Sequence, residues 1–128
     1  MANQSTYAGV VREVPIVPFP IAAASILVRG MVVQWNTGTQ LAEPWSVGTN
    51  VGLGVCTGDA DLSGLKVDVY CGKGASVLIK CATGIVPNPN DFLFWSAPGV
   101  VSNTGTAGQQ FARAIGVGYN GYVEAIIT

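Results

Sequence analysis

Glycine and proline interrupt this chain so often that a fold built on long helices is disfavoured. Seventeen Gly and seven Pro are spread over 128 residues, among Val, Ile, Thr and aromatic residues. This mixture is typical of short strands separated by turns. No stretch shows a sustained apolar stripe at helical spacing; the nearest candidate, residues 107–115, is short and contains Gly108. The sequence therefore predicts a mainly β fold.

The clearest strands lie in the middle of the chain. Apolar and polar residues alternate over residues 65–71 and again over residues 76–81, as expected for strands that bury one face. Between them, residues 72–74 read Gly-Lys-Gly, a turn sequence that tolerates positive φ. We predict that the two strands pair as a hairpin centred on Lys73.

The two halves of the chain echo each other. Trp35 and Trp95 lie 60 positions apart, and each follows an apolar run. Further matches come in the same order: residues 36–39 with 103–106, 51–55 with 114–118, and 65–69 with 122–126, where Asp68 and Glu124 are the lone acids. Two related β units of roughly 60 residues would bury their apolar faces against each other in a compact barrel or sandwich. Chance similarity in a chain rich in Gly and Val is the alternative.

The first 24 residues differ from the rest. Over residues 14–20, proline alternates with bulky apolar side chains, so three backbone positions cannot donate a hydrogen bond and the segment is unsuited to a central strand. We predict an extended, proline-rich arm over residues 1–24 and a single β domain over residues 25–128. The arm is expected to lie across a neighbouring subunit. A strand or loop packed over its own domain is the alternative.

Charged side chains are scarce. Six Lys and Arg and seven Asp and Glu make up 10% of the chain, whereas soluble domains average about 25%. A surface this poor in charge predicts that neighbouring subunits cover part of it. The basic residues are scattered singly and the net charge is −1, so nucleic acid is not expected as a partner.

Several kinds of chemistry are disfavoured by residue type. The chain has no His, which is the commonest general base, zinc ligand and activator of nucleophiles. Two Gly-x-Gly sequences, at residues 52–54 and 116–118, lack the third glycine and the helix of a dinucleotide site. Asp59 and Asp61 could offer carboxylates to calcium, but a solvated turn is the better interpretation. We expect no enzyme activity, no cofactor and no metal.

Cysteine usage and hydropathy bear on the compartment. Cys56, Cys71 and Cys81 are odd in number and form no Cys-x-x-Cys motif, so we expect free thiols. The apolar stretch over residues 10–28 is interrupted by charges and prolines, and its longest uninterrupted run, residues 21–28, is far below the roughly 20 residues that span a bilayer. No basic residue precedes Arg12, as a signal peptide would require. A reduced protein made in the cytoplasm, without a membrane partner, is predicted.

The aromatic residues allow one alternative function. Trp and Tyr faces could stack on sugars, although core packing is the better interpretation for the Trp residues that end strands. The candidates for glycan stacking are Trp45 and Tyr119.

The order of these segments resembles that of small bacteriophage capsid decoration, or cement, proteins. The likeness covers residues 20–128 and rests on Gly30-Met-Val-Val-Gln-Trp35, the Gly-Leu-Gly-Val strand at 52–55, Ala82-Thr-Gly-Ile-Val86, the strand at 91–95 and Ile115-Gly-Val-Gly118. The resemblance implies a β-tulip head, usually trimeric, seated outside the capsid at three-fold or quasi-three-fold positions, where it clamps neighbouring coat subunits. It also implies an N-terminal segment, residues 7–20 here, that orders on the capsid. The proline-rich arm and the turn over residues 86–90 depart from the family pattern.

We therefore predict a non-enzymatic, homotrimeric virion protein that is made in the host cytoplasm and stabilises the capsid from its exterior by binding the major coat protein. The candidate contact residues are Tyr7, Val14, Pro15, Ile16, Val17, Pro18, Phe19 and Pro20. The alternatives are a carbohydrate-binding or adhesin-like module displayed on a particle, and a fibre or pilin-like subunit.

Overall fold

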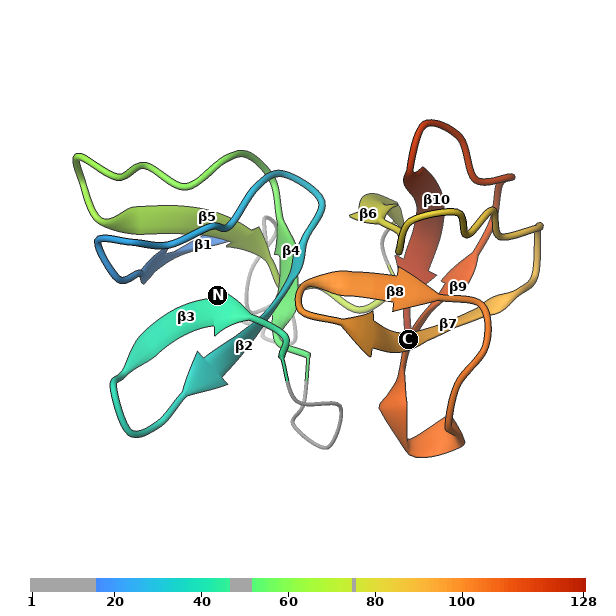
Figure 1. The fold of residues 1–128 in the computed structure, drawn as a ribbon, viewed down its shortest axis with the longest axis horizontal. Coiled ribbons are helices and arrows are strands. Elements are labelled where there is room, and N and C mark those ends of the chain that lie inside the picture. Colours follow the sequence, from blue (N-terminus) through green and yellow to red (C-terminus); the bar gives the residue numbers. More distant parts are fainter. Residues whose placement is uncertain (1–15, 47–51, 75) are drawn as a thin grey trace, which may run out of the picture.

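The computed structural model describes residues 16–46, 52–74 and 76–128, which form ten short strands (Figure 1). The first five are β1 (Ile16–Pro20), β2 (Val32–Asn36), β3 (Leu41–Pro44), β4 (Gly54–Cys56) and β5 (Lys66–Tyr70). The second five are β6 (Ser76–Lys80), β7 (Phe92–Ala97), β8 (Val100–Ser102), β9 (Gln110–Ala114) and β10 (Tyr122–Ile127). A short 3-10 helix, η1 (Ala107–Gln109), precedes β9, and the described residues contain no α-helix. The mainly β prediction is confirmed.

The strands form two five-stranded antiparallel sheets with one shared topology. The order is β1-β5-β4-β2-β3 in the first unit (β1–β5) and β6-β10-β9-β7-β8 in the second unit (β6–β10). Adding five to each strand number of the first order gives the second, so the two orders are the same. The prediction of two similar units is confirmed. Neither sheet closes into a barrel, because its edge strands approach only at one isolated bridge, Ile21 to Ala42 in the first unit and Cys81 to Val101 in the second.

The correspondence extends to the register of the strands. Equivalent cross-strand pairs include Pro18–Asp68 with Leu78–Glu124, and Val33–Gly54 with Leu93–Ala112. Backbone bonds outside the ladders repeat as well. The Cys56 N–H donates to the Met31 carbonyl at 2.9 Å, and the Ala114 N–H donates to the Asp91 carbonyl at 2.8 Å. Shared bonds of this kind show that the two halves repeat one backbone design.

Two of the matches made from the sequence are wrong in detail. Residues 36–39 turn between β2 and β3, so their counterpart is the turn between β7 and β8, not residues 103–106, which follow β8. Similarly, β4 corresponds to the end of β9 and not to residues 114–118. The shared Asn-Thr-Gly-Thr sequence is a coincidence of turn chemistry, because Asn, Thr and Gly suit many turns.

The predicted hairpin around Lys73 does not form, although both of its strands exist. β5 pairs with β1 and β4, whereas β6 pairs with β10. Each strand thus pairs within its own unit, and the segment around Gly72 links the two units. The Gly74 N–H donates to the Ile127 carbonyl at 2.8 Å and ties this linker to the second unit.

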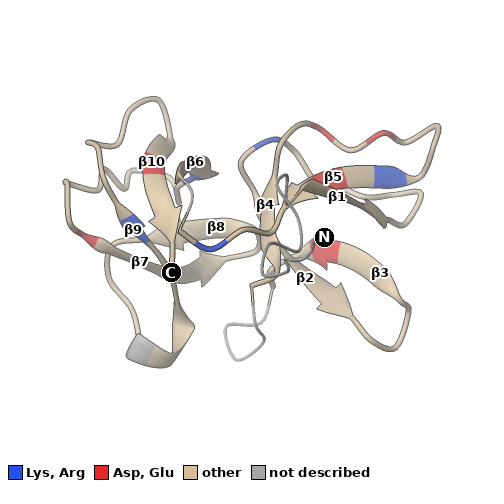
Figure 2. Cartoon of the chain, turned by 180° about the vertical axis from the view of Figure 1, so that it is seen from behind, with Lys and Arg blue, Asp and Glu red and all other residues tan. Residues whose placement is uncertain are grey.

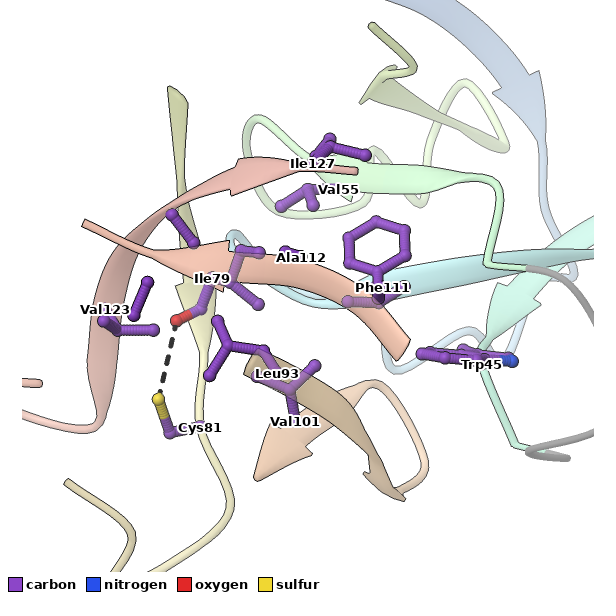
Figure 3. Close-up of a cluster of buried hydrophobic side chains, with 13 residues drawn as sticks. Trp45, Val55, Ile79, Cys81, Leu93, Val101, Phe111, Ala112, Val123 and Ile127 are labelled. Carbon is purple, nitrogen blue, oxygen red and sulfur yellow. Dashed lines mark hydrogen bonds between the residues drawn. The ribbon is translucent and has the colours of Figure 1, made fainter. Parts of the chain in front are cut away.

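The apolar core has two parts. One cluster lies within the first unit: Ile21, Leu27, Met31, Val33, Ala42, Cys56, Val67 and Val69. The other fills the second unit with Ile79, Cys81, Leu93, Val101, Phe111, Ala112, Ala114, Val123, Ala125 and Ile127, and it extends into the first unit through Val32, Trp45 and Val55 (Figure 3). The two units are therefore joined by one continuous buried cluster.

Part of the predicted arm is built into the first sheet. Residues 16–20 form β1, an edge strand that pairs with β5. An edge position suits Pro18 and Pro20, because a proline there leaves no ladder hydrogen bond missing on its outer side. Tyr7, Val14 and Pro15 lie outside the described residues. Contact of this segment with a neighbouring subunit stays a prediction.

Candidate interaction surfaces

The first surface is the buried contact between the two units. Val32 on β2 and Val55 on β4 face each other across the ladder, and strand alternation turns them away from the core of their own unit, which Val33 and Cys56 enter. They are nevertheless only 0% and 2% exposed, because the second unit covers them. One face of the first sheet is thus a docking surface for the second unit.

Backbone hydrogen bonds fix this contact. The Val32 N–H donates to the Gly99 carbonyl at 2.9 Å, and the Gly99 N–H donates to the Trp45 carbonyl at 3.1 Å. The same Trp45 carbonyl accepts a hydrogen bond from Trp95 Nε1 at 2.8 Å. The Lys80 N–H donates to the Gly30 carbonyl at 2.8 Å. These bonds set the register of the second unit on the first.

Trp45 belongs to this buried contact. Its ring lies 5.7 Å from that of Phe111, tilted by 49°, and the residue is 2% exposed. A sugar cannot stack on a face that is already packed, so the structure removes Trp45 from the glycan-stacking candidates. Tyr119, in contrast, is 78% exposed on the loop before β10.

The equivalent surface of the second unit faces solvent. Phe92 stands where Val32 stands in the first unit, and Arg113 stands where Val55 stands. Phe92 is 45% exposed, and the Arg113 guanidinium lies 5.1 Å from the centre of its ring. Ile126 pairs with Arg113 on the next strand, and Leu78, which is also exposed, lies on the same side of the sheet. We call Leu78, Phe92, Arg113 and Ile126 the open face.

The loops before β5 and β10 are a second point of difference between the units. Residues 57–65 carry Asp59 and Asp61, whereas residues 115–121 carry the exposed apolar side chains of Ile115, Val117 and Tyr119. Both loops expose apolar side chains, since Leu62 and Leu65 are also exposed in the first. Of these two loops, only the first carries acidic residues.

The acidic loop holds its own carboxylates. Asp61 Oδ1 accepts hydrogen bonds from the Ser63 N–H, the Ser63 hydroxyl and the Gly64 N–H at 3.1, 2.8 and 3.0 Å, and these bonds lower the pKa of Asp61. Asp59 accepts a hydrogen bond from the Arg29 N–H at 3.0 Å. Within the described ranges, no group of three or more His, Cys, Asp or Glu residues could hold a metal ion.

The thiols and the charged groups of residues 16–46, 52–74 and 76–128 form no metal-binding cluster. Cys56, Cys71 and Cys81 form no disulfide; burial raises the pKa of Cys56 to about 12 and also raises that of Cys81. Lys, Arg, Asp and Glu lie scattered over both sheets (Figure 2). A cavity of about 220 Å³ between the units is lined by both polar and apolar groups, among them Lys73, Gln110, Leu53 and Phe111. In the part of the chain that the structure describes, no helix could span a membrane.

The residues of β1 that were predicted to contact the capsid lie at the edge of the first sheet. Ile16, Pro18 and Pro20 are exposed, while Val17 and Phe19 are half-buried. The Phe19 ring lies 5.8 Å from that of Trp35. The structure therefore leaves one side of β1 available and turns the other toward its own unit.

The open face is a feature that sequence reasoning missed. Strand alternation places Phe92 and Leu93 on opposite sides of a sheet, but it does not show which side a second unit covers. The pattern that could have found this face is the spacing of 60 positions, which makes Phe92 the counterpart of Val32.

Comparisons with known proteins point to one fold. No protein-family model matches the chain, and no curated protein matches it. Among solved structures, the head fiber gp8.5 N base of bacteriophage phi29 is similar, with a TM-score of 0.66 and 19% sequence identity. The match covers 88% of this chain and 94% of that one. The similarity thus includes both units and is one of fold.

Proposed function

We propose that the chain is a non-enzymatic structural protein of a bacteriophage virion, bound to the outside of the head. The observation that carries this proposal is the fold shared with a phage head fiber base over 88% of the chain. A match of that extent includes the pairing of the two units, and not only a common sheet. The absence of His from the sequence agrees with a role that needs no general base.

The surface chemistry supports a protein that works in an assembly. Charged residues make up 10% of the chain, and large apolar side chains are exposed on both units, including Ile16, Leu78, Phe92 and Val117. Exposed apolar area of this kind is typical of surfaces that neighbouring subunits cover. The sparse charge gives no electrostatic basis for binding nucleic acid.

We further propose that the protein is a homotrimer that clamps neighbouring coat subunits and so stabilises the capsid. Contact would come from residues 7–20, with the exposed side of β1, namely Ile16, Pro18 and Pro20, next to the coat. Each copy would bury a modest area. Three linked copies would bind more tightly than one, because the first contact raises the effective concentration of the others.

A second candidate is the base of a head fibre. It is favoured by the name of the structural neighbour, which is itself a head fiber base. Both candidates place the two-unit domain on the head, and they differ in what projects from it. Averaged electron micrographs of decorated heads distinguish them, since a decoration protein shows a knob alone and a fibre base carries a longer projection.

The direct test is co-sedimentation of the purified full chain with empty heads of its phage. We expect saturable binding and a higher temperature of head disruption when the sites are filled. A variant that lacks residues 2–15 keeps all of β1 and tests the preceding segment; its occupancy should fall at least about tenfold if that segment supplies a main contact. A full chain that does not bind heads would refute the proposed function.

A further inference from the structure

We propose that the open face is covered by the first unit of a second copy of this chain, packed as the second unit packs on Val32 and Val55. The inference rests on the proposed homotrimer and names the surfaces that would form it. The contact within each chain is the starting observation, because there the second unit already packs on the outer face of the first unit.

The internal contact is head to tail. The first unit contributes its outer face, with Val32 and Val55, whereas the second unit contributes a different surface, with Gly99, Trp95 and Phe111. A contact between two different surfaces of related units leaves one copy of each surface unused, and further units can then be added until a ring closes. The unused face is the open face of the second unit.

The unused docking surface belongs to the first unit. By strand register, the counterparts of Gly99, Trp95 and Phe111 are Gln40, Trp35 and Leu53. Trp35 and Gln40 are exposed and Leu53 is half-buried. Gln40 has a φ of 57° and Gly99 a φ of 76°, so both are left-handed. The turns differ otherwise, because four residues separate the pair Asn36–Leu41 and two separate Ala97–Val100. The Gln40 N–H donates to the Asn36 carbonyl of its own turn at 2.7 Å, so its carbonyl is the group left for a contact like that of Gly99.

The β2–β3 turn, which carries Gln40, and the start of β7, which carries Phe92, lie far apart, whereas Leu53 lies next to the contact between the units, where it lines the cavity. Figure 1 shows the β2–β3 turn at one end and the start of β7 at the other. This arrangement lets the second unit of one copy receive the first unit of the next without displacing the internal contact. Three copies would then place six related units in one ring.

The residue types on the open face suit a protein partner. Aromatic residues and Arg are enriched in the centres of interfaces, and here Arg113 lies over the ring of Phe92, with Ile126 beside Arg113 on the next strand. Leu78 lies one strand further out, and its partner Glu124 adds an exposed acidic group on the same side of the sheet. The repeat is not complete in detail. The Lys80 N–H donates to the Gly30 carbonyl inside the chain, but the counterpart of Lys80 is Pro20, which has no N–H. We therefore expect the contact between copies to be weaker than the contact between units.

The first experiment measures the mass of the full chain by light scattering over a hundredfold range of concentration. We expect a trimer, and we expect Phe92→Asp and Arg113→Glu each to raise the concentration of half-dissociation at least about tenfold. Ile26→Asp is the matched control, because it places the same charge on an exposed apolar residue outside both surfaces. Far-UV circular dichroism checks that each variant is folded.

The second experiment uses cross-linking between chains and does not depend on losing an interaction. The Val32 N–H contacts the Gly99 carbonyl within the chain, so position 92 of one copy should lie beside position 40 of the next. Refolded mixtures of Phe92→Cys and Gln40→Cys should cross-link with a short bis-maleimide, and each variant alone gives the background from the native thiols. Ile26→Cys mixed with Gln40→Cys should stay at that background.

Each outcome decides the inference. Dissociation by both open-face variants together with the cross-link supports it. A trimer that survives both variants overturns it while leaving the homotrimer intact, and loss of head binding by such a trimer would assign the open face to the coat protein instead. A monomeric wild-type chain overturns both the inference and the homotrimer, while binding of that monomer to heads would still uphold the proposed virion function.

Discussion

The same face has opposite surroundings in the two units. In the first unit it carries Val32 and Val55 and is sealed by the second unit; in the second unit it carries Phe92 and Arg113 and meets solvent. Topology is shared and so is most of the register, although β7 has register shifts against β8 and β9 that β2 lacks. At the paired positions of this face, the units differ in their side chains. Backbone design thus determines where a face lies, and substitution on that face determines whether a neighbour must cover it.

The loop ends differ in the same way. The first unit places hydrogen-bonded carboxylates before β5, and the second places Ile115, Val117 and Tyr119 before β10. The first loop also exposes Leu62 and Leu65, so the two loops differ in their acidic residues and not in having exposed apolar side chains. Exposed apolar side chains therefore occur on both units, and the two units differ in where those side chains lie.

The largest expected loss of stability tests the buried contact between the two units. Trp45→Ala should lower the free energy of unfolding by about 3–5 kcal/mol, because it empties a buried site beside Phe111. Thr104 occupies the equivalent position in the second unit and is exposed, so Thr104→Ala should cost less than about 1 kcal/mol. Urea denaturation of both variants measures the contrast. Equal losses would show that the two positions have the same surroundings after all.

A second comparison concerns a glycine that only one unit requires. A Cβ on Gly54 would meet the Tyr70 carbonyl oxygen and, at 2.7 Å, Val69 Cγ1, whereas the equivalent residue in the second unit is already Ala112. Gly54→Ala should therefore destabilise by about 1–3 kcal/mol through overpacking. The reverse change, Ala112→Gly, should cost about 1 kcal/mol or less. Thermal unfolding followed by circular dichroism provides the test, and a neutral Gly54→Ala would contradict the tight packing of β4 on β5.

The sequence predicted the strands more accurately than it predicted their partners. Alternation located β5 and β6, and the spacing of Trp35 and Trp95 revealed the duplication. The hairpin around Lys73 was wrong because alternation specifies which side of a strand is buried and not which strand lies beside it. Trp45 was a candidate for glycan stacking for a related reason, because the residues next to it in the sequence do not show that a second unit covers it.

The next predicted change in stability is smaller, and it is a gain and not a loss. Leu65 has a φ of 52°, and its counterpart Gly121 has a φ of 80°. A left-handed backbone costs a residue with a Cβ about 1–2 kcal/mol, and the Leu65 side chain is exposed. Leu65→Gly should therefore raise stability by about 0.5 kcal/mol after the added flexibility of the unfolded chain is counted.

The mirror substitution completes this comparison. Gly121→Ala should lower stability by about 1 kcal/mol from backbone strain alone, because a Cβ on Gly121 meets no atom within 4 Å. Urea titrations of the two variants beside the wild type would measure both signs. A stabilising Gly121→Ala would show that the left-handed turn is not needed before β10.

The smallest effect concerns acid. Asp61 and Asp91 both have a pKa below the ordinary 3.8 because backbone N–H and side-chain groups donate to their carboxylates. A lowered pKa in the folded state means that the stabilisation is complete above the unfolded value and is lost as pH falls through the folded one. Asp61 lies in the first unit, and the equivalent residue of the second unit is Tyr119. Asp91 lies in the second unit, and the equivalent residue of the first unit is Met31.

Acid should therefore weaken the hydrogen bonds to Asp61 in the first unit and those to Asp91 in the second. Amide resonances of Ser63 and Gly64 should shift as Asp61 is protonated, and that of Asn88 should shift as Asp91 is protonated. Asp61→Asn keeps an oxygen that accepts from these amides but cannot be protonated in this range, so it should abolish the first set of shifts and leave the second unchanged. Titration by NMR below about pH 5 measures both sets. Loss of both sets in this one variant would mean that acid acts on the two units together, through the contact that joins them.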